Sequence, residues 1–201
     1  MNILAISCSP RKNGATVEVL EEVLRGAKDE GSSVELYSVA GKTLNGCTSC
    51  YACSEKGECV LQDDMSELYS KMIDADGIVF GTPIYYYGMT AQAKAIIDRS
   101  FSLNTPEKSL RNKVGGVVTV AGSLGMMDAL KDFYFFFAVK QMLPANYVAM
   151  YSGAVDDLKK LEKGMKAAGE LGRQMVKLVE KKFEYPQDSP PRPFAFGTHT
   201  H

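Results

Sequence analysis

The chain has 201 residues, of which 45% are hydrophobic and 23% are charged, and its formal net charge is −1. These values are typical of a globular protein with one sizeable core. A net charge near zero disfavours binding to nucleic acid or to anionic membranes, and no apolar run approaches the ~20 residues of a membrane-spanning helix. We therefore expect a soluble cytoplasmic protein.

The first third of the chain alternates apolar runs with stretches of helical spacing. Asn2 to Ser7 predicts a strand, and the polar turn from Ser7 to Gly14 follows it. Apolar residues recur at helical spacing from Thr16 to Lys28, and Val34 to Val39 predicts a second strand. The segment from Gly41 to Asp63 has no regular period. Loops of this length inside a compact domain are usually functional.

The remainder of the chain continues the alternation. Asp64, with Glu67 three residues later, resembles a helix start. Further strands are predicted over 77–80, 114–121 and 145–151. Further helices are predicted over about 90–101, from the turn at 122–125 to Gln141, and over 156–183. The run from Val114 to Ala121 has the composition of a strand buried on both faces, which is typical of a parallel sheet. Five strands alternating with five helices predict an α/β fold with a doubly wound sheet in the order 2-1-3-4-5. Ligands of such sheets bind beyond the carboxyl ends of the strands.

Four cysteines lie close together in the irregular segment, at Cys47, Cys50, Cys53 and Cys59. A C-x₂-C-x₂-C start suits an iron–sulfur cube held by thiolates. Zinc is the main alternative, although zinc sites usually bring two C-x₂-C pairs separated by a dozen or more residues. Disulfides fit less well, because the first residues lack the features of a secretory signal peptide. The fifth cysteine, Cys8, ends the first apolar run, and we expect a buried side chain there rather than a ligand.

Three loops at the ends of predicted strands suit a mononucleotide. Residues 9–16 bring hydroxyl and amide groups to a helix N-terminus, where a monophosphate can bind, and they lack the patterns of triphosphate and dinucleotide loops. Residues 82–88 offer three tyrosines for a flat ring, and the glycines of residues 121–125 permit close backbone approach. Each loop alone is also consistent with an ordinary turn. At one edge of a sheet, the three together predict a mononucleotide site with a slot for the ring.

Several motifs, all of them in the first hundred residues, resemble those of a known family, and the remainder of the chain resembles it only by topology. They are the turn 9–16, the four cysteines, the sequence 63–65, the run 75–86 and the sequence 94–99. In combination they are similar to the flavodoxin-like NADPH-dependent FMN reductases. The complete C-x₂-C-x₂-C-x₅-C set is similar to the branch called iron–sulfur flavoproteins. Two departures are Cys8, where the family usually has glycine, and the third loop, which lacks a Gly-Gly-Gln pattern.

The resemblance implies two cofactors, FMN and a [4Fe–4S] cluster, in a flavodoxin-like fold with a cysteine-rich loop, 43–63, inserted after strand 2. It places the cluster on the four grouped cysteines. It places the FMN phosphate on Ser9, Arg11, Asn13, Ala15 and Thr16. It places the flavin ring against Thr82, Pro83, Ile84, Tyr85, Tyr86, Gly88, Gly122 and Ser123.

The function implied by the resemblance is that of a flavin-dependent oxidoreductase. It would move electrons between a reduced carrier such as ferredoxin, or NAD(P)H, and an acceptor, and would assemble as a homodimer or homotetramer. One alternative is an NAD(P)H-dependent FMN or quinone reductase whose thiols are free or hold zinc. Another is a flavodoxin-like electron carrier, which the balance of 23 basic and 24 acidic residues disfavours because flavodoxins tend to be strongly acidic.

No catalytic side chain is assigned, because the only two histidines, His199 and His201, end the chain. We expect one domain over residues 1–184. A proline-rich tail over 185–201 follows it, since its prolines forbid regular helix.

Overall fold

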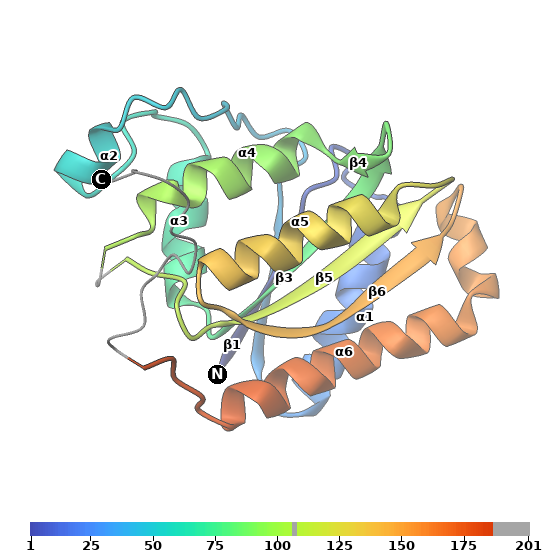
Figure 1. The fold of residues 1–201 in the computed structure, drawn as a ribbon. Coiled ribbons are helices and arrows are strands. Elements are labelled where there is room, and N and C mark those ends of the chain that lie inside the picture. Colours follow the sequence, from blue (N-terminus) through green and yellow to red (C-terminus); the bar gives the residue numbers. More distant parts are fainter. Residues whose placement is uncertain (106–107, 187–201) are drawn as a thin grey trace.

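Five parallel strands form the centre of the molecule, as the ribbon drawing shows (Figure 1). The structure, a computed structural model, describes residues 1–105 and 108–186. The strands lie in the order β2-β1-β3-β5-β6. Their bounds are β1 Asn2–Ser7, β2 Ser33–Ser38, β3 Gly77–Tyr85, β5 Val114–Ala121 and β6 Leu143–Tyr151. The numbering skips β4 (Gly88–Met89), a two-residue strand that pairs antiparallel with β3. The predicted doubly wound sheet is therefore confirmed, and its order differs from the predicted 2-1-3-4-5 only because the short β4 is inserted in the count.

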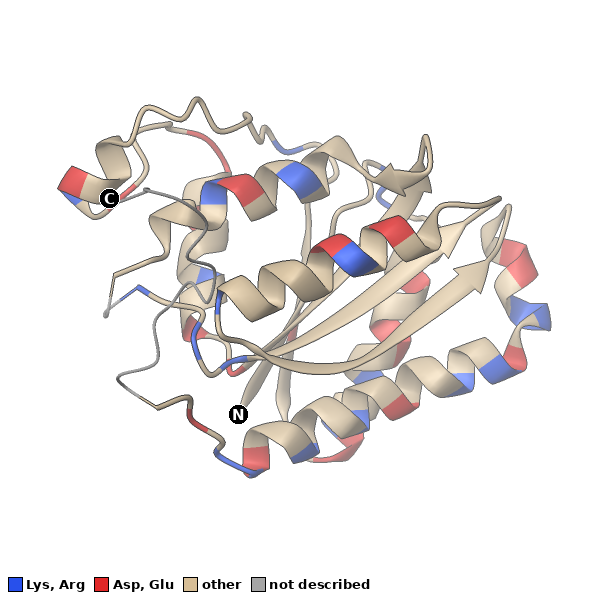
Figure 2. Cartoon of the chain, in the orientation of Figure 1, with Lys and Arg blue, Asp and Glu red and all other residues tan. Residues whose placement is uncertain are grey.

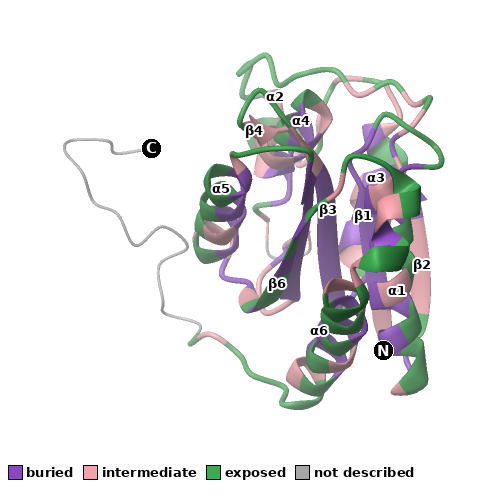
Figure 3. Cartoon of the chain, turned by 90° about the vertical axis from the view of Figure 1, so that its right-hand side faces the viewer, coloured by how far each residue is buried: buried purple, intermediate pink, exposed green. Residues whose placement is uncertain are grey.

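Helices cover both faces of this sheet (Figures 1 and 3). Residues of α1 (Ala15–Asp29) and α6 (Glu162–Glu180) form one apolar core with the strands. Residues of α3 (Met65–Asp74), α4 (Ala91–Arg99) and α5 (Met126–Val139) form the core on the opposite face. Acidic and basic residues are interspersed along α6, whereas the acidic residues of α1 lie mainly in its first half and its basic residues in its second half (Figure 2). Within the described ranges, no helix is both long and apolar enough to cross a bilayer.

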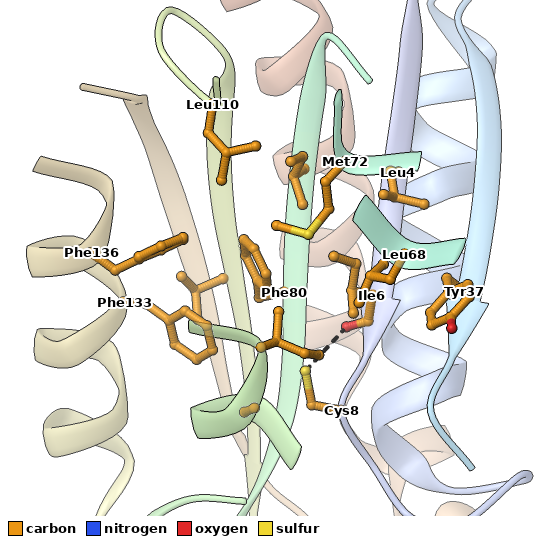
Figure 4. Packing of buried hydrophobic residues seen from close by; sticks show 14 of the residues in the cluster. Leu4, Ile6, Cys8, Tyr37, Leu68, Met72, Phe80, Leu110, Phe133 and Phe136 are labelled. Atoms are coloured by element: carbon orange, nitrogen blue, oxygen red, sulfur yellow. Dashed lines mark hydrogen bonds between the residues drawn. The ribbon is translucent and has the colours of Figure 1, made fainter. Parts of the chain in front are cut away.

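Strand β1 supplies both cores because its side chains alternate between the two faces. Leu4 and Ile6 belong to the core under α3 to α5, whereas Ile3 and Ala5 belong to the core under α1 and α6. Figure 4 shows Cys8 in the first of these cores. Its side chain is 0% exposed, and its Sγ lies 3.9 Å from the carbonyl oxygen of Ile6. The expectation that Cys8 is buried is therefore confirmed.

The closing helix begins later than its sequence pattern predicts. Residues Val155–Lys160 form a 3₁₀ helix, and α6 starts only at Glu162. The carboxylate of Asp157 accepts a hydrogen bond from the backbone N–H of Ala154, which favours the tighter turn. The predicted tail lies almost wholly in residues 187–201, outside the described part of the chain. Its first residues are held by Arg111, whose guanidinium donates to the carbonyls of Tyr185 and Pro186.

Candidate functional site

The first two predicted loops are joined at the carboxyl ends of β1 and β3. The backbone N–H of Cys8 donates to the carbonyl of Gly81 over 2.8 Å. The hydroxyl of Thr90 donates to the carbonyl of Cys8 over 2.9 Å, and the N–H of Thr90 donates to the hydroxyl of Thr82 over 3.1 Å. Thr90 therefore links the turn after β1 to the end of β3 while it also caps α4. The sequence marked Thr90 only as the start of a helix, and its bridging role was missed.

The turn from Ser9 to Thr16 ends at the N-terminus of α1. Ser9 is buried, and its Oγ accepts a hydrogen bond from the N–H of Arg11 over 3.2 Å. The first N–H groups of a helix have no partner within the helix and carry the positive end of its dipole. Thr16 is buried in this first turn, whereas Arg11 and Asn13 are exposed. The turn thus combines the first N–H groups of α1 with two exposed cations, Arg11 and Lys12, an arrangement that suits a phosphate.

The second loop is a β-hairpin with a tight turn at its tip, whereas the sequence predicted a loop with a turn fixed by Pro83. Strand β3 continues to Tyr85, which pairs with Gly88 of β4. Tyr86 and Tyr87 form the turn with φ values of 47° and 65°. Positive φ at both central residues is the geometry of a type I′ hairpin. The chain thereby presents the side chain of Tyr86 fully to solvent.

The third loop packs against this hairpin at a glycine. Gly125 has a φ of 106°, and a Cβ at this position would lie 2.4 Å from the Cα of Tyr87. A shallow pocket of about 360 Å³ lies between the two loops, and its walls are Ile84, Tyr86, Tyr87, Ser123 and Leu124. Two tyrosine rings and two aliphatic side chains line the pocket, and Tyr86, Tyr87 and Ser123 bring three hydroxyl groups to it, a combination that suits a heteroaromatic ring with polar edges.

The predicted ring contacts divide into two groups. Ile84, Tyr86 and Ser123 line this pocket, together with two residues that the sequence reasoning did not name, Tyr87 and Leu124. Thr82 is buried, and its hydroxyl donates to the carbonyl of Pro83 over 2.9 Å. The other predicted contacts, Pro83, Tyr85, Gly88 and Gly122, neighbour the pocket in the chain without lining it.

The four grouped cysteines line a second pocket, of about 340 Å³, beside the C-terminal end of α4. They lie in the segment between β2 and α3, which contains a short helix, α2 (Ala52–Lys56), that the sequence did not reveal. Ser49 and Tyr51, on either side of Cys50, have φ values of 54° and 58°. Such left-handed conformations are costly for residues with a side chain and concentrate at functional sites. Here they turn the backbone at Cys50, between the outer cysteines of the C-x₂-C-x₂-C run.

The grouped thiols lie in different electrostatic surroundings. The N–H of Ala52 and the hydroxyl of Thr48 lower the pKa of Cys50. Burial raises the pKa of Cys53, and the charges of the three other thiols raise it further. The four thiolates therefore repel one another, so that a positively charged occupant of the pocket would be stabilised by all of them.

All four grouped cysteines line this one pocket. In the described part of the chain, no group of three or more His, Cys, Asp or Glu is arranged to hold one metal ion. The pocket that these cysteines line is many times larger than the ~30 Å³ that one water molecule occupies. Four cysteine thiolates around such a volume match the ligand set of an iron–sulfur cube.

A buried ion pair closes the cysteine-rich segment and was not anticipated from the sequence. Arg99, the last residue of α4, forms an ion pair with Asp63 at 2.5 Å, and both side chains are 1% exposed. Asp63 also accepts hydrogen bonds from the backbone of Asn45 and Met65. Burial alone would raise the pKa of Asp63, but Arg99 and these backbone donors outweigh it, so that the pKa lies below its usual value. Asp63 therefore stays ionised and holds both ends of the segment.

The β3–β4 hairpin lies near the start of α4, and the segment that contains α2 lies near its end (Figure 1). Residues of these two regions line the first and the second pocket, respectively. Thr90, which precedes the first residue of α4, contacts the loops around the first pocket. Asp98 and Arg99 at the end of α4, with Phe101 and Ser102 just beyond it, line the cysteine pocket. Nine helical residues at 1.5 Å per residue span about 14 Å. One short helix therefore separates the two candidate sites within the chain.

Comparisons with known proteins agree with this geometry. Residues 1–157 match the family model described as NADPH-dependent FMN reductase. The chain is 37% identical over 194 residues to an iron–sulfur flavoprotein of Methanocaldococcus jannaschii, covering 90% of this chain and 100% of that protein. It is 31% identical over 188 residues to an iron–sulfur flavoprotein of Archaeoglobus fulgidus, covering 91% and 82%. A solved flavone reductase superposes with a TM-score of 0.71 at 25% identity, covering 90% of this chain and 63% of that one.

Proposed function

The chain belongs to the NADPH-dependent FMN reductase family and to its iron–sulfur flavoprotein branch, and from this premise we propose its reaction. The protein is a flavin-dependent oxidoreductase. It transfers electrons between a reduced protein carrier of the ferredoxin class and an acceptor, through a [4Fe–4S] cluster and FMN. The observation that carries the proposal is the pocket lined by all four grouped cysteines.

FMN occupies the edge of the sheet where the three loops meet. The N-terminus of α1 favours the negative charge of its phosphate, and the pocket between the hairpin and the third loop accepts its ring. The phosphate contacts are Ser9, Arg11, Asn13, Ala15 and Thr16. The ring contacts are Thr82, Pro83, Ile84, Tyr85, Tyr86, Gly88, Gly122 and Ser123, to which the pocket adds Tyr87 and Leu124.

The cluster is held by Cys47, Cys50, Cys53 and Cys59. When bound, FMN exchanges electrons singly or in pairs and the cluster exchanges them one at a time, so the two connect different classes of redox partner. The side chains of this chain hold and shield these groups. Tyr51 and Phe101 make an edge-to-face contact at 6.1 Å between ring centroids, and both line the cysteine pocket, where they limit the access of water.

A homodimer or homotetramer is the proposed assembly. Four large side chains are exposed on neighbouring segments: Tyr86 and Tyr87 on the hairpin, Leu124 on the third loop and Met127 at the start of α5. Apolar and aromatic side chains grouped in this way are typical of contact surfaces between proteins. This surface borders the ring pocket, so an adjoining subunit would also cover the flavin.

Anaerobic purification followed by iron analysis and a visible spectrum tests the proposal. We expect flavin bands together with a broad iron–sulfur absorption and about four irons per chain. C50S should lose the iron and retain FMN, because the two pockets lie at opposite ends of α4. C8A, which removes a thiol that lies in the core, should retain both cofactors.

Flavin without iron in the wild-type protein would contradict the cluster assignment. It would leave an NAD(P)H-dependent FMN or quinone reductase with free or zinc-bound thiols as the function. In that case NADPH alone should bleach the FMN rapidly, and the zinc content would distinguish the two states of the thiols. Simultaneous loss of iron and FMN in C50S would show that the metal organises the whole fold.

A further inference from the structure

Arg99 is an unusual residue for the end of a helix because its side chain is buried. The residue is 2% exposed, and it is one of the largest fully buried side chains in the described chain. Removal of a guanidinium from water is costly unless the charge is paired and its N–H groups are hydrogen-bonded. Burial lowers the pKa of Arg99, but Asp63 and Cys59 raise it by more, so the side chain remains charged.

Every hydrogen bond of this guanidinium goes to the cysteine-rich segment and its end. Nη1 donates to Asp63, over 2.7 and 2.5 Å to the two oxygens, and to the carbonyl of Asn45 over 3.3 Å. Nη2 donates to the carbonyl of Leu61 over 3.3 Å and to the Sγ of Cys59 over 3.5 Å. The planar fork of arginine makes these contacts at once, which lysine cannot do.

The contact with Cys59 distinguishes this thiol from the others. In the described residues, Cys59 is the one grouped cysteine whose sulfur accepts a hydrogen bond from a cationic side chain, whereas Cys47 accepts from the backbone N–H of Ser49. Hydrogen bonds to ligating sulfurs and net charge are two of the factors that set the potential of an iron–sulfur cluster. Arg99 supplies a hydrogen bond and a positive charge at the same ligand, Cys59.

One donor of Arg99 remains unused. Its Nε is buried and has no hydrogen-bond partner among residues 1–105 and 108–186. Arg99 also lines the cysteine pocket. A buried donor without a partner is costly, and an occupant with acceptor atoms, such as sulfide, would satisfy it.

We propose that Arg99 is a positioning residue that raises the reduction potential of the cluster through Cys59, and that Asp63 moderates this effect. The inference rests on the proposed function, because it presumes a cluster on the four cysteines. One electron taken from the reduced carrier oxidises that carrier by one electron and adds one negative charge to the pocket. The fixed positive charge beside Cys59 favours this reduced state, whereas the carboxylate of Asp63 opposes it.

The test compares two substitutions that change the charge near Cys59 in opposite directions, in the purified protein with its cluster bound. R99Q removes the positive charge, and D63N removes the negative charge while it keeps a side chain of the same shape. The control is R111Q, because Arg111 contacts Gln141 and the start of the tail rather than the cysteines. Cluster potentials are measured by redox titration with electron paramagnetic resonance, and FMN potentials by titration in the visible range.

We expect R99Q to disfavour one-electron reduction of the cluster by about tenfold, which corresponds to a potential about 59 mV lower. D63N should shift the potential upward, and R111Q should leave it unchanged. The FMN potential should stay the same in all three variants, which a general loosening of the fold would not produce.

Two results would overturn the inference. The first is an unchanged cluster potential in R99Q, or shifts of the same sign in R99Q and D63N, with iron and FMN at wild-type levels. The second is loss of iron in R99Q while R111Q keeps its iron, which would mean that Arg99 only stabilises the structure of the cysteine-rich segment. Absence of iron from the wild-type protein would instead refute the proposed function, so the two failures are distinguishable.

Discussion

The hydroxyl of Thr90 donates a hydrogen bond to the backbone carbonyl of Cys8 over 2.9 Å, across 82 positions of the sequence. The same hydroxyl accepts from the N–H of Ala93 and so caps α4. One buried oxygen thus fixes the start of a helix to the turn that precedes α1. Four predictions follow from this contact and from others around the two pockets.

Substitution T90V should destabilise the protein by about 2–4 kcal/mol. The loss of a helix cap costs about 1 kcal/mol, and a buried carbonyl left without its donor costs about 1–3 kcal/mol. Urea denaturation measures the change in the free energy of unfolding. T90S keeps the hydroxyl and should lose much less stability, so equal losses in T90S and T90V would contradict this role of the hydrogen bond.

Substitution G125A should separate the third loop from the hairpin. Its Cβ would lie 2.4 Å from a backbone atom of Tyr87, and a φ of 106° disfavours any side chain. We expect a loss of at least ~2 kcal/mol in the free energy of unfolding, with weaker FMN binding. G122A is the matched control, because a Cβ there meets no atom within 4 Å. Similar denaturation midpoints for the two variants would refute the packing argument.

Substitution T16V should weaken FMN binding and leave the iron content unchanged. Valine has nearly the shape of threonine but lacks the hydroxyl that we assign to the phosphate. A hydrogen bond to a charged group contributes about 1.5–3 kcal/mol, so the dissociation constant should rise by about tenfold to a hundredfold. Fluorescence titration of the apoprotein with FMN measures this change. T16S, which keeps the hydroxyl, should bind FMN nearly as the wild type does.

The thiol of Cys8 should make the protein less stable at high pH. Burial raises its pKa to about 12 in the folded state, from 9.0 for an unperturbed thiol. Between these values the unfolded chain binds fewer protons than the folded one, so the free energy of unfolding falls as the pH rises above about 9. C8A lacks this group, and its stability should decline less steeply over the same range in denaturation experiments. Parallel curves for C8A and the wild type would contradict the buried-thiol explanation.

The strands that the sequence predicts most accurately are those that consist mainly of apolar residues. β1 at Asn2–Ser7 and β5 at Val114–Ala121 have the predicted bounds, because an unbroken apolar run leaves little choice of where a buried strand starts and ends. The start of α6 was predicted too early, because the charged residues of the preceding 3₁₀ helix fit a helical period equally well. The hairpin was missed because tyrosine rarely adopts positive φ, and here two tyrosines in succession do so.

In the candidate site, too, the sequence predicts features that depend on neighbouring residues and misses contacts between residues far apart in the chain. The spacing of the cysteines is local, and the structure brings all four to one pocket, as the sequence led us to expect. The pairing of Arg99 with Asp63 joins residues 36 positions apart, and a single sequence contains no signal of which charges meet in the folded chain. Thr90 escaped notice for a similar reason, since its partner Cys8 is still farther away.

Helix α4 has a consequence for how the molecule can be altered. Its first turn is tied to the loops of one pocket, and its last residue is tied to the segment that forms the other. A proline or an inserted turn in the middle of this helix would therefore shift both ends relative to each other while the sheet beneath stays intact. The length of α4 thus sets the separation of the two pockets within one chain, and under the proposed function a change in that length would change the distance between the flavin and the cluster.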